Sequence, residues 1–171
     1  RWDTNPQAAN ASLQGLVMNR NYTRDEPFGL EDIAFATTHP GYRGAVVYRG
    51  FTRTPTTFRR LRLTAPRLDT TLEDTMPFGL YLRRTGNLRV EDVEIIASKG
   101  VFGRDDVRHI SITGSLVRYN NFGFKFSAMS HNLVVAGNTI EVTGPTNGNT
   151  SLCLDPFYSD TDPYCRDVLD R

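Results

Sequence analysis

The sequence predicts an all-β fold, a solenoid of about six coils in which parallel strands stack from one coil to the next. A six-residue pattern, apolar-x-x-apolar-x-apolar, recurs along most of the 171 residues, and a second short apolar segment recurs between its copies. Apolar and polar residues alternate within both segments, which is typical of β strands and not of amphipathic helices. Repetition of this kind indicates a core built by stacking similar units.

The first recurring segment predicts the first strand of each coil. Its copies are Leu13/Leu16/Met18, Leu30/Ile33/Phe35, Phe58/Leu61/Leu63, Val90/Val93/Ile95, Ile112/Ser115/Val117 and Val135/Asn138/Ile140. Each coil of a solenoid pairs with its neighbours, so equivalent positions of successive copies should share one core. The side chains expected to point inward are Leu30, Ile33, Phe58, Leu61, Val90, Val93, Ile112, Val117, Val135 and Ile140.

The second recurring segment predicts the other strand of each coil. It reads GAVVY at 44–48, GLYL at 79–82, GVFG at 100–103, GFKF at 123–126 and SLCL at 151–154. Each copy follows a corner, so every turn of the chain contains one strand of each type in the same order. The middle positions of these copies, which include Tyr81, Lys125 and Cys153, should then point outward.

Three stretches, NLRVEDVEIIASKG, VRHISITGSLVRYNNFGFKF and HNLVVAGNTIEVTG, resemble the right-handed parallel β-helix proteins of the pectin-lyase-like superfamily. The resemblance covers about residues 28–144 and implies a right-handed parallel β-helix. Such folds often place a small polar residue at a coil corner, which Ser115 and Asn138 would match. Gly114 and Gly137 accompany them, which suits a backbone turn that side chains obstruct.

A β-sandwich built from hairpins is the alternative fold. It should show two-residue turns such as Asn-Gly between neighbouring strands, but Asn147-Gly148 lies in the late segment GPTNGNTS. The β-helix interpretation divides the chain into an N-terminal irregular segment with the first coil (1–27), the β-helix coils (28–144) and a C-terminal loop segment (145–171), closed by a disulfide.

The net charge is +1, and it is unevenly distributed along the chain. Residues 33–68 contain seven arginines and no acidic residue, whereas five aspartates occur from Asp155 onward. No apolar run approaches the roughly 20 residues of a membrane helix, and the sequence contains no phosphate-binding glycine loop. We therefore expect no membrane insertion, no nucleotide chemistry and no nucleic-acid partner.

Asp105, Asp106 and His109, in FGRDDVRHI, resemble the acidic pair and histidine of polygalacturonase-like hydrolases. In those enzymes the two carboxyl groups protonate the leaving oxygen and activate water. The chain lacks their Gly-His-Gly and Arg-x-Lys motifs. The alternative is that these three residues only form a coil corner before a strand.

Lys99 and Lys125, the two lysines of the chain, loosely resemble the basic residues of β-helical polysaccharide lyases. Such a base removes the proton beside a uronate carboxylate, while further cations, often including calcium, stabilise the enolate. Glu91, Asp92 and Glu94 offer calcium ligands from one coil only. Two solvated lysines are the alternative, so the sequence leaves open whether the chain is an enzyme, either a polysaccharide lyase or a glycoside hydrolase.

The sequence predicts no metal site and no cofactor. Its three histidines and two cysteines lack the spacing of zinc ligands. The acid-rich DPFYSDTD at 155–162 could hold calcium, but it does not match the helix-loop-helix calcium pattern. An exposed loop is the alternative for this segment.

The cysteines and sequons favour an extracellular or cell-surface location. Cys153 should point outward and pair with Cys165 across 11 intervening residues, a closure worth about 3 kcal/mol. Asn10, Asn21 and Asn149 begin Asn-x-Ser/Thr sequons and are the expected glycosylation sites. Disulfides and glycosylation both occur on the oxidising, secretory route.

The outward column is the predicted binding surface. Stacked second strands would place Tyr81, Phe102 and Lys125 on neighbouring coils. Close after them would come Arg83, Arg84, Arg104 and Asp105. Aromatic rings cover the apolar face of a sugar, while Arg and Lys pair with carboxylate or sulfate groups. The predicted function is therefore that of an extracellular β-helix that binds or processes an acidic polysaccharide; a solvated face without a ligand is the alternative.

A second function class is a non-catalytic structural module of an extracellular fibre, appendage or adhesin. Solenoid ends expose unpaired strand edges, and neither end of this sequence shows a capping helix. Excess arginine early in the chain and excess aspartate late would favour head-to-tail contacts between copies, which extend into filaments.

Overall fold

The computed structural model describes residues 16–20, 28–37, 44–66, 77–127, 130–143 and 150–155. Every regular element in these ranges is a β strand, so the predicted all-β class is confirmed. The strands are β1 (Leu16–Arg20), β2 (Phe28–Glu31), β3 (Ala34–Ala36), β4 (Gly44–Arg59), β5 (Arg62–Thr64), β6 (Phe78–Glu91), β7 (Glu94–Ile96), β8 (Lys99–Thr113), β9 (Leu116–Tyr119), β10 (Phe122–Ser127), β11 (His131–Ala136), β12 (Thr139–Val142) and β13 (Thr150–Asp155).

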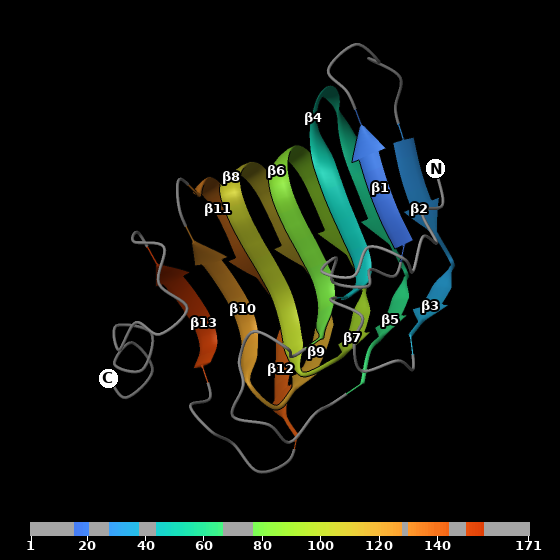
Figure 1. Ribbon diagram of the computed structural model, residues 1–171, viewed down its shortest axis with the longest axis vertical. Coiled ribbons are helices and arrows are strands. Elements are labelled where there is room, and N and C mark those ends of the chain that lie inside the picture. The colour runs from blue at the N-terminus through green and yellow to red at the C-terminus, as the bar shows by residue number, and fades with distance from the viewer. Residues whose placement is uncertain are drawn as a thin grey trace, which may run out of the picture.

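The strands form two sheets whose neighbours all run parallel (Figure 1). One sheet has eight strands in the order β1-β4-β6-β8-β10-β13, with β2 beside β4 and β11 beside β8. The other has five strands in the order β12-β9-β7-β5-β3. This parallel stacking is that of a β-helix or solenoid, and the hairpin sandwich, which needs antiparallel neighbours, is wrong.

The apolar residues of the first recurring segment align in two columns across neighbouring strands. Leu30, Phe58, Val90, Ile112 and Val135 are aligned in the eight-stranded sheet, and Phe35, Leu63, Ile95, Val117 and Ile140 in the five-stranded sheet. The central members are fully buried, and those on the outer strands β2, β3, β11 and β12 are partly buried against them. Burial of one such side chain stabilises the fold by roughly 1.5 to 3 kcal/mol.

Ile33 is the exception among the ten side chains that the repeat places inward. It is 38% exposed, although the equivalent Leu61 and Val93 are buried. Backbone hydrogen bonds link these corners in succession, from Arg62 N to Ile33 O and from Glu94 N to Leu61 O. Ile33 belongs to the first corner of that series, so among the described residues it is covered from one side only.

The first copy of the repeat is wrongly assigned by the sequence pattern. Leu13 lies outside the described residues, and β1 pairs with the first part of β4, with Leu16 opposite Val46 and Met18 opposite Tyr48. The strand therefore belongs with the GAVVY segments. An apolar-x-apolar end occurs in both kinds of segment, so the pattern alone does not separate them.

A sharp corner joins the two sheets in every repeat. The residue at this corner has a left-handed backbone each time: Asp32 (φ 57°), Arg60 (φ 50°), Asp92 (φ 53°), Gly114 (φ 63°) and Gly137 (φ 63°). The predicted glycine turn is thus confirmed. Aspartate tolerates this conformation better than most residues, whereas arginine does not.

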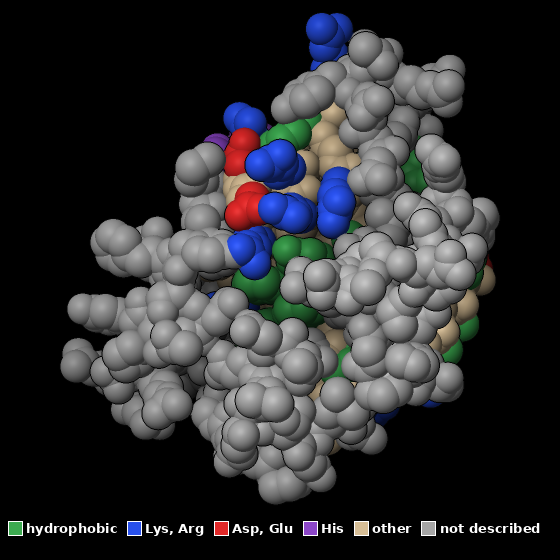
Figure 2. All heavy atoms as spheres, viewed as in Figure 1, with side chains coloured by type: hydrophobic (Ala, Val, Ile, Leu, Met, Phe, Trp, Pro, Cys, Tyr) green, Lys and Arg blue, Asp and Glu red, His purple; other side chains and the backbone are tan. Residues whose placement is uncertain are grey.

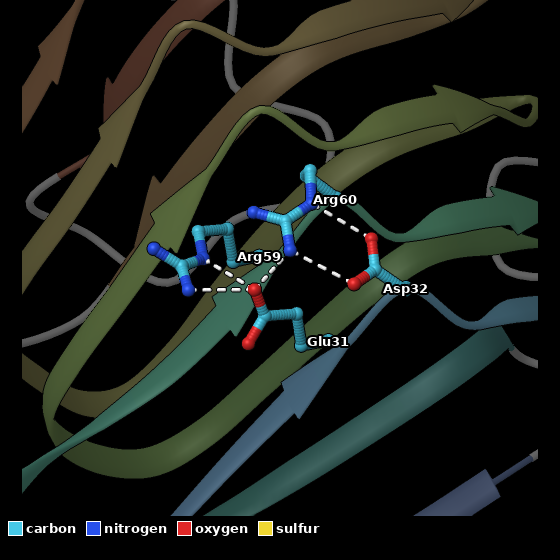
Figure 3. Close-up of polar contacts among 4 residues, drawn as sticks. All are labelled: Glu31, Asp32, Arg59 and Arg60. Atoms are coloured by element: carbon cyan, nitrogen blue, oxygen red, sulfur yellow. Dashed lines mark hydrogen bonds and ion pairs between the residues drawn. The ribbon is translucent and has the colours of Figure 1, made fainter.

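Arg60 is held at its corner by acidic residues of the preceding repeat (Figure 3). Its Nε lies 2.7 Å from Asp32 Oδ1, and its Nη2 also contacts Glu31, which pairs with Arg59 at 2.6 Å. The hydrogen bond from Arg60 holds the pKa of Asp32 below its ordinary value. All four side chains are exposed, so solvent screens each pair and each stabilises the fold only slightly.

A gentler bend divides each long strand of the larger sheet. Register shifts occur between Arg49 and Gly50 in β4 and between Arg83 and Thr85 in β6. Left-handed residues gather at this bend: Arg84, Asn87, Asp105, Asp106, His109 and Asn132. The bend separates the GAVVY-type part of each strand from the part that carries the first repeat.

Candidate anion-binding surface

Three arginines lie side by side at the bend, and we call them the arginine ladder. Arg49, Arg83 and Arg104 are register partners on β4, β6 and β8. Side chains alternate along a strand, and Val46, Leu80 and Val101 point into the core three residues earlier, so the ladder residues point outward. Strand spacing sets their backbones about 4.8 Å apart.

Part of this positive charge is not neutralised. Arg83 Nε lies 2.6 Å from Asp105 Oδ2, and Arg104 Nε lies 3.4 Å from Asp105 Oδ1. Arg49 has no acidic partner among the described residues, and its buried Nε makes no hydrogen bond with them. Arg84 is exposed next to the ladder and likewise pairs with no described acidic residue. The ladder therefore presents guanidinium groups that an incoming anion can bind.

The second aspartate of the bend is also engaged by an arginine. Asp106 Oδ2 lies 2.8 Å from Arg108 Nη2, and the guanidinium carbon of Arg108 stands 4.5 Å from the centre of the Phe51 ring. Figure 2 shows basic side chains grouped around two acidic ones on this face. Of the residues that the structure describes at the bend, five are arginines (Arg49, Arg83, Arg84, Arg104 and Arg108) and two are aspartates (Asp105 and Asp106).

The candidate hydrolase residues all lie at this bend. Asp105, Asp106 and His109 have φ angles of 56°, 70° and 55°. They therefore form part of the bend inside β8 and not a corner before a strand, which was the alternative interpretation of FGRDDVRHI. Each carboxylate is bound to arginine, and the His109 ring is 6.2 Å from that of His131. These ion pairs hold the two carboxylates among the arginines of the bend.

The predicted aromatic column has the expected register but not the expected exposure. Tyr81, Phe102 and Lys125 are aligned on β6, β8 and β10, and Cys153 of β13 follows them. Tyr81, Phe102 and Lys125 are only 2%, 5% and 7% exposed, respectively. Tyr81 and Phe102 stack at 5.6 Å within a second apolar cluster that includes Phe78. An open platform for sugar rings at this column is therefore wrong.

Lys99 lies in the same buried environment. It is the register partner of Phe78 and of Phe122, and its Nζ stands 5.1 Å and 5.5 Å from the centres of those rings. Its side chain is 5% exposed. The ammonium group is thus placed for cation–π contacts, and the alternative of two solvated lysines is wrong.

Several predicted residues cannot be placed in the fold. Cys165, Asn10, Asn21, Asn149 and most of DPFYSDTD lie outside the described residues, and only the backbone of Cys153 is described. Within the described ranges, no group of three or more His, Cys, Asp or Glu side chains is arranged to hold a metal ion. None of the described segments is a helix long and apolar enough to cross a membrane.

The predicted surface included Arg83, Arg84 and Arg104 but omitted Arg49. The sequence does carry the signal, because GAVVY, GLYL and GVFG are each followed directly by arginine. Comparison of the chain with protein-family models, curated proteins and solved structures found no match. The functional argument therefore depends on the geometry of this surface alone.

Proposed function

We propose that this protein is an extracellular right-handed β-helix of about six coils that binds an acidic polysaccharide along its arginine ladder. The single observation that carries the proposal is the alignment of Arg49, Arg83 and Arg104 on consecutive parallel strands, with Arg84 beside them. Guanidinium groups form paired hydrogen bonds with carboxylate and sulfate groups. A polymer that follows the stacking direction meets one such group on each strand.

The energetics favour a polymer over a small ion. An exposed ion pair contributes only roughly 0.2 to 1 kcal/mol, so a single contact at this surface would be weak. Several contacts along one chain add to a measurable affinity, and salt should screen them. A nucleic acid is the less suitable polyanion, because the aromatic rings of Tyr81 and Phe102 are buried and cannot stack on bases.

The test compares polymers of different charge. Binding of a polyuronate, a sulfated glycan, neutral dextran and single-stranded DNA is measured by calorimetry at about 50 mM and about 500 mM salt. We expect the acidic glycans to bind at low salt, to weaken at high salt, and to exceed dextran. Equal binding of dextran, or tighter binding of DNA than of both acidic glycans, would overturn the proposal.

A structural module remains the second candidate, and the large exposed hydrophobic residues favour it. Ile33, Val134 and Val142 lie on the outer strands or corners at the two ends of the stack. In a head-to-tail contact, β1 of one copy would pair with β13 of another. If the strand register within one copy continued across the contact, Asp155 would lie opposite Asn19, and Arg20 would be the next residue along β1. Light scattering over a range of protein concentrations tests this candidate; a monomer at every concentration would count against it.

A further inference from the structure

A groove of about 260 Å³ lies beyond the bend from the arginine ladder. It crosses four neighbouring strands, from Pro55 on β4 to Val134 on β11. Asn87, His109 and Asn132 stand in one column along it, each directly before the aligned residues Leu88, Ile110 and Leu133. All three have a φ of 55°, so the same left-handed turn recurs on three successive strands.

One side of the groove is suited to an anion. Arg89 lines it, is exposed, and pairs with no acidic side chain among the described residues. Ser111 lies beside Arg89 as its register partner and also lines the groove. None of the lining residues is acidic. A guanidinium next to a hydroxyl can bind a carboxylate with a charge-assisted hydrogen bond and a second, neutral one.

The remainder of the groove is suited to hydroxyl groups and to an apolar ring face. The amide nitrogen of Asn87 donates to the carbonyl of Thr52, which leaves its side-chain oxygen without a partner among the described residues. His109 and Asn132 contribute further polar groups in the same column. Val134 is 52% exposed at one end of the groove, opposite Pro55 at the other.

From these features we infer that the groove binds one acidic sugar unit. The carboxylate would lie between Arg89 and Ser111, the hydroxyls against Asn87 and Asn132, and an apolar face of the ring on Val134. The volume of 260 Å³ is just below that of sites for drug-sized ligands, about 300 to 1,000 Å³, and so fits a single ring. This site is separate from the arginine ladder and does not depend on it.

The inference is tested with monosaccharides, which are too short to span the ladder. The histidine ring signals of ¹³C,¹⁵N-labelled protein are followed by NMR during titration with glucuronate, glucose and acetate. We expect saturable shifts at His109 with glucuronate, and affinities about tenfold weaker for glucose, which lacks the charge, and for acetate, which lacks the ring.

Single-residue variants of the groove test whether glucuronate binds there. Arg89→Gln should weaken glucuronate binding by about tenfold and Ser111→Ala by a few-fold, since the first removes a charge-assisted contact and the second a neutral one. Arg62→Gln is the matched control, because Arg62 is an exposed arginine of the other sheet that pairs with Glu94. An absence of saturable glucuronate binding, equal binding of glucose, or unchanged binding in Arg89→Gln would overturn the inference. Circular dichroism of each variant verifies the fold.

Discussion

The side-chain amide of Asn138 links its own corner by hydrogen bonds to the preceding corner, where Ser115 lies. Asn138 Oδ1 accepts a hydrogen bond from the backbone N–H of Ser115, and Asn138 Nδ2 donates to the carbonyl of Ile112, both at 2.9 Å. One corner earlier the Ser115 hydroxyl makes a related link: it accepts from Val93 N–H of the preceding repeat at 3.1 Å, but it donates to the carbonyl of Thr113 in its own repeat. Polar side chains at this position thus satisfy backbone groups that the corner would leave unpaired.

Replacement of Asn138 by alanine should therefore destabilise the protein. It removes two hydrogen bonds and leaves the N–H of Ser115 and the carbonyl of Ile112 without partners, at a cost of about 1 to 3 kcal/mol. Urea denaturation measures the change in the free energy of unfolding. Thr139→Ala, at the exposed neighbouring position, is the control. If both variants unfold at the same urea concentration as the native chain, the side-chain bridge does not stabilise the corner.

The two corner glycines should differ in their tolerance of alanine. Both have a φ of 63°, so alanine costs about 1 to 2 kcal/mol at either position. A Cβ at Gly114 would also lie 2.6 Å from Asp92 Oδ1, whereas a Cβ at Gly137 meets nothing within 4 Å. Thermal denaturation should show a larger loss for Gly114→Ala than for Gly137→Ala.

The excess loss at Gly114 has a specific cause that can be removed. In a chain that already carries Asp92→Ala, Gly114→Ala and Gly137→Ala should cost the same free energy of unfolding. If the difference persists in that background, the contact with Asp92 does not account for it.

Asp32 should make the stability of the fold depend on pH in the acid range. Arg60 lowers the pKa of Asp32, so the stabilisation is complete above the ordinary aspartate value of about 3.9 and is lost as the pH falls through the lowered one. Asp32→Asn should therefore be less stable than the native chain at neutral pH, and the difference should shrink below about pH 4. Denaturation midpoints between neutral pH and about pH 2 measure it; a difference that is constant over this range would contradict the assignment.

Most of the strand arrangement could be predicted from the sequence. Alternation places Phe58, Val90 and Ile112 on the same side of successive strands, and a repeat that conserves this side requires stacked parallel neighbours. Alternation does not show where a repeat begins. The sequence pattern therefore places Leu16 in a strand of the first type, although it lies in a strand of the second, GAVVY type. It also gives no account of the ends of the stack, where Ile33 lacks a second neighbour among the described residues.

The candidate site could be predicted only in part. The alternation of side chains along a strand correctly predicts that Tyr81, Phe102 and Lys125 point away from the main core. It does not predict whether other residues cover that face of the sheet. The arginine ladder could be predicted, because each of its arginines directly follows a copy of the second recurring segment and lies before the register shift at the bend. The groove depends on left-handed residues such as His109 and Asn132, and the sequence gives little sign of a positive φ outside glycine.

The most direct test of the binding proposal is a calorimetric titration of the protein with an acidic polysaccharide, repeated for arginine variants. Arg49→Gln and Arg84→Gln should each weaken binding by roughly two- to fivefold, the double variant by more, and Arg62→Gln not at all. A double variant that folds and binds the acidic polysaccharide as tightly as the native chain would contradict the account.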